Sequence, residues 1–204
     1  MSVHISLHHN FIKTTPLACI IMASGKGERF GSNKLLVEFK GKPLLQHILE
    51  TTSLPFAKRL VVTRYEAVVK LCHSLNIDAV LHDQPYQNDT VRIGLENLPQ
   101  EDYAGFLFCT GDQPLLTQES ILNLWEAFAK DPNYIYRTTF NDVPGNPIIF
   151  PTKFKDQLLH LPQDRGGSYL TKKYPEQVRY VPVQDCNELY DIDTKSDLEN
   201  LLFR

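Results

Sequence analysis

Four short apolar runs constrain the fold of this chain more than any other feature. Each has the length of a buried strand, and the runs are residues 17–22, 59–63, 79–82 and 105–110. Segments with a helical spacing of apolar residues follow them, at residues 43–49, 65–75, 89–98 and 117–130, with Asp89 and Thr117 as expected caps. This alternation predicts an α/β fold: a single Rossmann-like domain whose mostly parallel sheet carries helices on both faces.

The second half changes character. Further strands are expected at 134–139, 147–150 and 178–183, with a turn at 141–145 and helices near 152–160, 167–173 and 194–202. No internal repeat or linker interrupts residues 17–204, which we expect to form one domain. Residues 1–16 are polar and predict an N-terminal extension, although His4 and His8 would share a helix face and leave a metal site conceivable.

Composition limits the function classes. The chain has 204 residues and a formal net charge of -3, which gives no general attraction to nucleic acid or to an anionic membrane, so a small-molecule substrate is expected. No apolar run reaches the length needed to span a bilayer, and the first sixteen residues do not resemble a signal peptide. The four cysteines are widely spaced, which fits a reducing compartment, and we expect a cytoplasmic protein.

The first apolar run leads into a loop with three glycines and three basic residues. These are Gly25, Gly27 and Gly31 with Lys26, Arg29 and Lys34. Glycine permits positive φ and close backbone approach, so successive amides can surround an anion. The spacing fits neither the dinucleotide fingerprint nor the P-loop. The loop therefore predicts a phosphate-binding site that matches neither of these two motifs. The alternative is a loop that only turns the chain, with its charged side chains in solvent.

Acidic residues occur after the apolar run 105–110 and before the last predicted helix. Asp112 comes directly after the run 105–110, at the sheet edge where open parallel sheets bind ligands. A carboxylate facing a phosphate site calls for a cation, and magnesium combines carboxylates with phosphate oxygens. Asp191 and Asp193 share a face before the last helix and could supply a second ligand. The alternative for both sites is helix capping.

Five segments together resemble a known family. The glycine loop, Gly41–Leu45, Thr110–Thr117, Pro144–Phe150 and Leu189–Thr194 resemble, in this order, the MobA-like nucleotidyltransferases, and most closely their molybdenum cofactor cytidylyltransferase branch. The resemblance covers residues 17–202. It implies a nucleotide-diphospho-sugar transferase-like fold and a magnesium-dependent enzyme that transfers CMP from CTP to the molybdopterin cofactor and releases pyrophosphate.

The resemblance also implies roles for individual residues. The implied nucleotide-binding residues are Ala23, Ser24, Gly25, Gly27, Arg29, Lys34, Thr90, Arg92 and Asp112. Among these, Arg29, Lys34 and Asp112 would be catalytic. Asp112 would hold magnesium together with Asp193 or Asp191, and Gly145, Asn146 and Pro147 would line the acceptor pocket. Asp164–Ser168 corresponds to a looser segment on the acceptor side.

Several alternatives remain open from the sequence. Ala23-Ser24 stands where a Gly-Gly pair would favour a guanylyltransferase, and Asn146 stands where the cytidylyl branch often has histidine. The rival enzymes are a molybdopterin guanylyltransferase and a sugar-phosphate or polyol-phosphate nucleotidyltransferase. A different class is a non-catalytic carrier that delivers the cofactor to a molybdenum hydroxylase, which the retained acidic residues disfavour.

Overall fold

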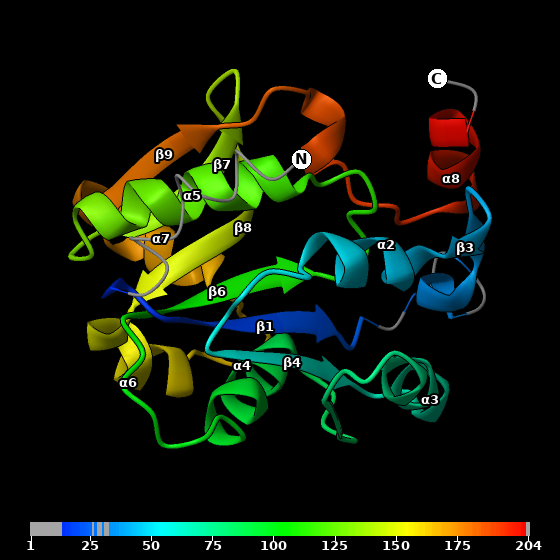
Figure 1. Cartoon of the computed structure of the whole chain (residues 1–204), viewed down its shortest axis with the longest axis horizontal. Coiled ribbons are helices and arrows are strands. Elements are labelled where there is room, and N and C mark those ends of the chain that lie inside the picture. The colour runs from blue at the N-terminus through cyan, green and yellow to red at the C-terminus, as the bar shows by residue number, and fades with distance from the viewer. Residues whose placement is uncertain (1–13, 26, 28–29, 31–32, 203–204) are drawn as a thin grey trace.

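The computed structural model describes residues 14–25, 27, 30 and 33–202, and within them the chain forms one large sheet (Figure 1). Its strands, in spatial order, are β5 (Ala79–Leu81), β4 (Lys58–Thr63), β1 (Leu17–Ala23), β6 (Gly105–Thr110), β8 (Val143–Pro151), β7 (Ile135–Phe140) and β9 (Val178–Pro182). Only β8 in this sheet runs antiparallel to its neighbours. The predicted mostly parallel α/β sheet is confirmed.

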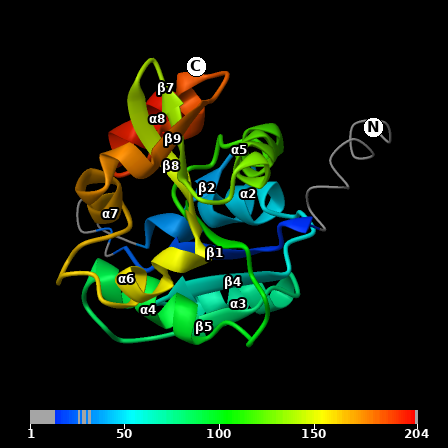
Figure 2. The same ribbon diagram turned by 90° about the vertical axis from the view of Figure 1, so that its left-hand side faces the viewer.

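Helices cover both faces of the sheet (Figure 2). One face packs against α2 (Leu44–Thr51), α3 (Glu66–Ser74) and α5 (Gln118–Lys130). The other packs against α4 (Gln87–Glu96), α6 (Lys155–Leu159) and α7 (Ser168–Lys173). A smaller apolar cluster joins the hairpin of β2 (Glu38–Phe39) and β3 (Lys42–Pro43) to α8 (Lys195–Leu202). The short 3-10 turns are η1 (Lys34–Leu36), η2 (Thr152–Phe154), η3 (Pro175–Gln177) and η4 (Cys186–Leu189).

The first described residues of the chain are held to the core by hydrogen bonds. Trp125 is fully buried, stacks on Phe56 with ring centroids 4.9 Å apart, and donates from Nε1 to Thr15 O at 2.9 Å. Ala104 N donates to Pro16 O at 2.8 Å. The last residues of the predicted extension therefore contact the domain, while residues 1–13, with His4 and His8, lie outside the described part.

Two sequence predictions are wrong in detail. Asp89 is not the N-cap of α4, because the helix begins at Gln87 and Tyr86 holds that position. Asp89 is the third helical residue, and its carboxylate accepts a weak capping-box hydrogen bond from Tyr86 N at 3.4 Å. The expected turn at 141–145 is shorter, since Asn141 and Asp142 both adopt positive φ and β8 resumes at Val143. A two-residue turn with positive φ at both positions fits the twist of a hairpin, so Pro144 and Gly145 belong to the strand.

Cys19, Cys72 and Cys109 are buried free thiols, and Cys186 is an exposed one. Among the described residues, none of the helices is long and apolar enough to cross a membrane.

Candidate active site

The carboxyl ends of β1 and β6 border a cleft of about 550 Å³. The two strands are parallel neighbours, so the chain leaves the sheet at Ser24 and at Gly111 on the same edge, as the sequence predicted. The loop before α4 and the C-terminal segment close the sides of the cleft. The predicted site residues that line it are Ser24, Gly25, Gly27, Lys34, Thr90, Asp112 and Asp193.

Lys34 links the two sides of this cleft. Its Nζ lies 2.7 Å from Asp112 Oδ2 and 2.7 Å from Asp193 Oδ1, and its side chain is only 7% exposed. Burial by itself lowers the pKa of Lys34, but the charges and hydrogen bonds of the two aspartates outweigh burial and raise the pKa above its ordinary value. Lys34 is therefore a fixed positive charge at the sheet edge.

Local structure holds Lys34 in this position. Asn33 precedes η1 and its Oδ1 accepts a hydrogen bond from Leu35 N at 3.2 Å. Leu35 is buried in the core, and Val37 N donates to Lys34 O at 3.2 Å. The backbone around Lys34 is thus fixed on both sides, and its side chain extends from a rigid base.

The C-terminal segment reaches the cleft through contacts with the end of β6. Ile192 N donates to Asp112 O at 3.0 Å, and the buried Gln113 donates from Nε2 to Leu189 O at 3.3 Å. Ile192 itself is fully buried. These contacts place Asp193 beside Asp112, although 81 positions separate them in the sequence (193 − 112).

At the start of α8, Thr194 caps the helix and the neighbouring Asp193 pairs with a charged side chain. Thr194 N donates to Asp197 Oδ2 at 2.7 Å, and Asp197 N donates back to Thr194 Oγ1 at 3.1 Å, which is a capping box for α8. The Asp193 carboxylate is left to contact Lys34. Of the two readings open from the sequence, capping therefore applies to Thr194 and not to Asp193.

Asp191 has a strongly perturbed carboxyl group. Desolvation in the crowded segment and then the negative charges of Asp112 and Asp193 raise its pKa to about 7, with Lys34 opposing the rise. The residue keeps an exposed surface, so water weakens the effect without reversing its direction. Asp191 is not among the residues that line the cleft, whereas Asp193 is.

The donor set around Lys34 fits a magnesium ion. Asp112 Oδ1 is buried and has no hydrogen-bond partner among the described residues, and the second Asp112 oxygen shares Lys34 with Asp193. Magnesium binds through one or two carboxylates together with substrate phosphates and water. A complete protein cage is not required: within the described residues, no three His, Cys, Asp or Glu side chains form a metal-binding group.

The described part of the glycine loop leaves room for a ligand. A Cβ at Gly25 would meet no atom within 4 Å, and Tyr65 donates from its hydroxyl to Gly25 O at 2.8 Å. Gly27 has φ +60°, a conformation that favours glycine. The predicted site residue Arg29 lies outside the described residues, as do Lys26 and Gly31.

His82 contacts the cleft residue Ser24 from a neighbouring hollow that it lines with Arg64 and Asp83, and sequence reasoning missed this contact. Ser24 donates from Oγ to Val62 O at 3.1 Å, so its contact of 2.8 Å with His82 Nε2 is accepted from a proton on that nitrogen. His82 Nδ1 is then an acceptor, and it is buried without a partner in the part of the chain that the structure describes. His82 is a polar residue at the end of the short strand β5, on the same sheet edge as Ser24. That position is the signal in the sequence that could have indicated the contact.

Other predicted residues lie outside the lining of the cleft. Arg92 is in α4 and forms ion pairs with Asp89 at 3.3 Å and Glu96 at 2.8 Å. Ala23 is buried in β1, and its carbonyl accepts from Thr63 Oγ1 at 2.9 Å. Gly145, Asn146 and Pro147 lie in β8 just beyond its last pair with β6, Phe108–Ile148. Their binding roles stay predictions.

A glycine loop that faces a lysine and two carboxylates, at the carboxyl edge of a mostly parallel sheet, defines an α/β nucleotide-binding protein. Residues 19–178 match the family described as MobA-like NTP transferase domain, and the chain belongs to this family. The family and the fold identify it as a nucleotidyltransferase.

Individual relatives agree with this assignment. The chain is 28% identical over 196 residues to a probable molybdenum cofactor guanylyltransferase from Aquifex aeolicus, covering 90% of this chain and 89% of that protein. Its fold is similar to Rv0371c from Mycobacterium tuberculosis, with a TM-score of 0.83, 21% identity and coverage of 93% and 100%. It is also similar to 4-diphosphocytidyl-2C-methyl-D-erythritol synthase from Anaerococcus prevotii, with a TM-score of 0.74, 20% identity and coverage of 95% and 97%.

Proposed function

We propose that this protein transfers a nucleotidyl group from a magnesium-bound nucleoside triphosphate to a phosphate of a molybdopterin-type acceptor. The observation that carries the proposal is the contact of Lys34 Nζ with Asp112 and Asp193, both at 2.7 Å, in the cleft that Gly25 and Gly27 also line. A cation and two carboxylates beside a phosphate-sized loop are the groups that nucleotidyl transfer requires.

The reaction needs no nucleophile from the protein. An oxygen of the acceptor phosphate bonds to the α-phosphorus of the triphosphate, and the bond from that phosphorus to the β-phosphate bridging oxygen breaks, so pyrophosphate leaves with its electron pair. The backbone amides of the glycine loop and the ammonium group of Lys34 orient the triphosphate and offset its negative charge. We assign the same role to Arg29. Asp112 and Asp193 would hold magnesium, which supplies positive charge next to the phosphate oxygens.

For the nucleoside triphosphate we propose CTP, with GTP as the second candidate. CTP follows from Ala23-Ser24, because a Gly-Gly pair at this place would favour the guanylyl branch. In the structure the Ser24 side chain lines the cleft and is held by contacts with Val62 O and His82 Nε2. GTP is favoured by the similarity to the Aquifex aeolicus relative, a probable molybdenum cofactor guanylyltransferase.

The acceptor assignment rests on the resemblance and on that relative. We propose that Gly145, Asn146 and Pro147 lie along the acceptor path, and that the product is passed to a molybdenum hydroxylase. A sugar-phosphate or polyol-phosphate acceptor is the alternative within enzymes. A cofactor carrier is disfavoured because it has no use for the carboxylates that converge on Lys34.

The proposal is tested by turnover of radiolabelled CTP and GTP with purified molybdopterin cofactor, in magnesium and in EDTA. We expect labelled dinucleotide and pyrophosphate with CTP in magnesium, and none in EDTA. The Asp112→Asn variant should abolish turnover, whereas Asp78→Asn, which removes a surface carboxylate paired with Lys58, should leave it unchanged. Product from GTP alone would reverse the nucleotide assignment, and binding of the cofactor without turnover would favour the carrier.

A further inference from the structure

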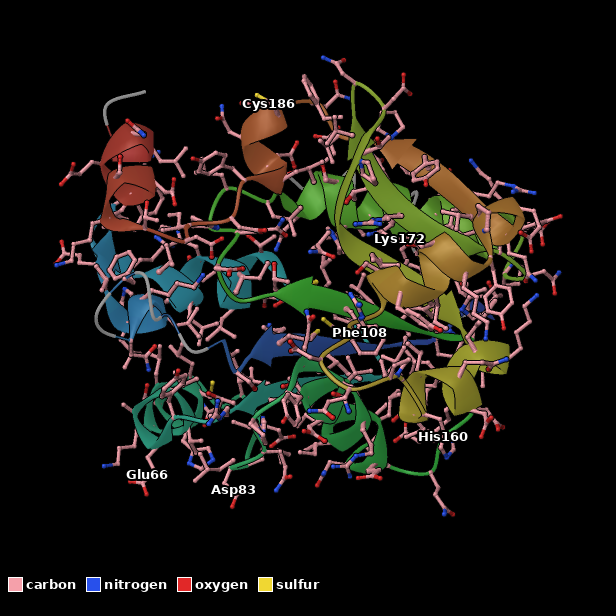
Figure 3. The ribbon with its side chains drawn as sticks, turned by 180° about the vertical axis from the view of Figure 1, so that it is seen from behind. Glu66, Asp83, Phe108, His160, Lys172 and Cys186 are labelled. Atoms are coloured by element: carbon pink, nitrogen blue, oxygen red, sulfur yellow. The ribbon has the colours of Figure 1, made fainter. Side chains whose placement is uncertain are left out.

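Arg137 is a cation in the interior of β7 that the proposed reaction has not used. It pairs with Ile148 of β8 and Tyr180 of β9 in the sheet register. Tyr136, the preceding residue, packs on the α5 face, so the Arg137 side chain lies on the opposite face of the sheet, under α7. Figure 3 shows α7, the helix that carries Lys172, lying over this face.

Arg137 makes hydrogen bonds only to neutral groups in the described part of the chain. Its Nε donates to Gly145 O at 2.8 Å, and its Nη1 donates to Thr171 Oγ1 at 3.2 Å. A guanidinium has five N–H donors, and both donors on Nη2 are without a partner among the described residues. No carboxylate there forms an ion pair with it. Three of the five N–H donors of the guanidinium thus have no partner among the described residues and are open to a ligand.

The burial of this charge calls for a counter-ion. Arg137 is half-buried, and desolvation lowers its pKa below the ordinary value, opposed only by Tyr180. Taking a cation out of water is costly unless an anion offsets the loss. A structural link between Gly145 and Thr171 would need no charge, because a neutral amide side chain can also donate two hydrogen bonds. An arginine at position 137 is better explained if its guanidinium binds an anion.

The position of Arg137 connects it with the acceptor side of the cleft. Its partner Gly145 packs so closely on Leu189 that a Cβ would lie 2.8 Å from Leu189 Cδ1. Leu189 is in turn held to Gln113, next to Asp112 at the end of β6. A series of contacts through Gly145, Leu189 and Gln113 therefore connects the guanidinium with the end of β6 that carries Asp112.

We propose that Arg137 is an anion-binding residue that holds an oxyanion of the acceptor, and that this oxyanion is a phosphate. The planar guanidinium presents two parallel donors that match a phosphate or a carboxylate. Phosphate is chosen because the acceptor of nucleotidyl transfer carries one, so this choice rests on the proposed function. The anion site itself rests on the contacts of Arg137.

The first experiment observes the guanidinium directly. The side-chain Nε–H signals of ¹⁵N-arginine-labelled wild-type protein are recorded during titration with inorganic phosphate, and the Arg137 signal is assigned by its loss in Arg137→Lys. We expect a saturable shift of this signal with phosphate and little change with potassium chloride of equal ionic strength. An unchanged signal, or an equal response to chloride, would overturn the anion site. A response to acetate as strong as that to phosphate would overturn the phosphate assignment.

The second experiment separates this site from the nucleotide site. Arg137→Met should weaken phosphate binding about ten- to one hundred-fold, the loss expected when charge-assisted hydrogen bonds to one phosphate are removed. Its magnesium-dependent binding of CTP should stay within about twofold of wild type. Arg59→Met is the matched control, because Arg59 is also half-buried and donates to a backbone carbonyl, Leu49 O, at the other end of the sheet.

The two proposals fail in different ways. If no nucleoside triphosphate binds but the Arg137 signal still responds to phosphate, the proposed function fails and the anion site stands. If triphosphates bind and react while Arg137→Met binds phosphate as wild type does, the anion site fails and the proposed function stands. Should Arg137→Met not fold, the titration of the wild-type Nε–H signal decides the anion site alone.

Discussion

Lys34 occupies the place between two carboxylates that a divalent cation would take. This has consequences for the lysine and for the cation. With Nζ 2.7 Å from each aspartate, the lysine neutralises part of their charge in the free protein. A bound magnesium ion would compete with Lys34 for the same oxygens, and Lys34 would then turn toward the phosphates of the triphosphate. In the proposed reaction Lys34 would thus be a counter-ion in the free protein and a phosphate ligand in the complex with magnesium and nucleotide.

Replacing Lys34 by glutamine should change turnover and metal affinity in opposite directions. Turnover should fall about 10²- to 10³-fold, the loss expected when one charge-stabilising group is removed from a transition state. Magnesium should bind the nucleotide-free variant more tightly, because a competing positive charge is gone. Calorimetry with magnesium and single-turnover kinetics measure the two effects. Lys58→Gln, which removes a partly buried lysine of β4 that pairs with Asp78, is the control, and weaker magnesium binding in Lys34→Gln would contradict the competition.

His82 should make the stability of the protein depend on pH in the mildly acidic range. Burial, and then the charge of Arg64, lower its pKa below the ordinary value of 6.5, while Asp89 and Asp83 oppose the shift. The unfolded chain therefore takes up the proton first as pH falls, so stability present above about pH 6.5 is lost below it. Urea denaturation at pH 7.5 and 5.5 should show a smaller difference for His82→Gln than for wild type.

The control for this prediction is His73→Gln, because His73 is exposed at the end of α3. That variant should keep the wild-type dependence of the urea midpoint on pH. Equal slopes for wild type and His82→Gln would show that protonation of His82 does not oppose folding.

At the scale of elements, α4 lies unusually close to the sheet. Gly94 is inside this helix, and a Cβ there would lie 2.8 Å from Ile20 Cγ2 and 3.3 Å from Val62 Cγ2. Gly94 therefore lets α4 approach β1 and β4, and the same approach brings Thr90, one turn earlier, to the cleft. The glycine serves packing and thereby the position of the site.

Gly94→Ala should destabilise the protein although alanine favours helix. The gain in helix propensity is about 1 kcal/mol, and overpacking a close contact costs about 1 to 3 kcal/mol. We expect a net loss of about 1 kcal/mol in the free energy of unfolding, measured by urea denaturation. Ala67→Gly in the exposed part of α3 calibrates the propensity. A Gly94→Ala variant more stable than wild type would show that the helix moves away from the sheet at little cost.

The elements also show how far sequence reasoning reached. Apolar runs and helical periodicity predicted the strands and most helices, because burial leaves a regular pattern. The boundaries at Asp89 and residues 141–145 were wrong, because alternative caps and turns differ by single hydrogen bonds. The contact of Lys34 with Asp112 and Asp193, and the burial of Arg137, depend on pairings between distant segments, which no local pattern contains.

At the scale of the whole molecule, a filled cleft should stabilise every element that contributes to it. The cleft receives residues from the end of β1, the end of β6, the start of α4 and the C-terminal segment. A ligand that binds only the folded protein raises the free energy of unfolding by about 2.7 kcal/mol at one hundred times its dissociation constant. For a chain of this size, that corresponds to a rise of about 5 to 10 °C in the melting temperature.

We expect this rise with CTP and magnesium together, and little of it with either alone, because the carboxylates and the triphosphate repel each other until a cation lies between them. Differential scanning fluorimetry with CTP, magnesium and EDTA in all combinations measures it. The rise should be lost in Asp112→Asn and kept in Asp78→Asn, whose missing carboxylate lies at the far edge of the sheet beside Lys58. If CTP stabilised the protein equally in EDTA, Lys34 and the glycine loop would be sufficient to hold the triphosphate, and the two aspartates would serve only to position the lysine.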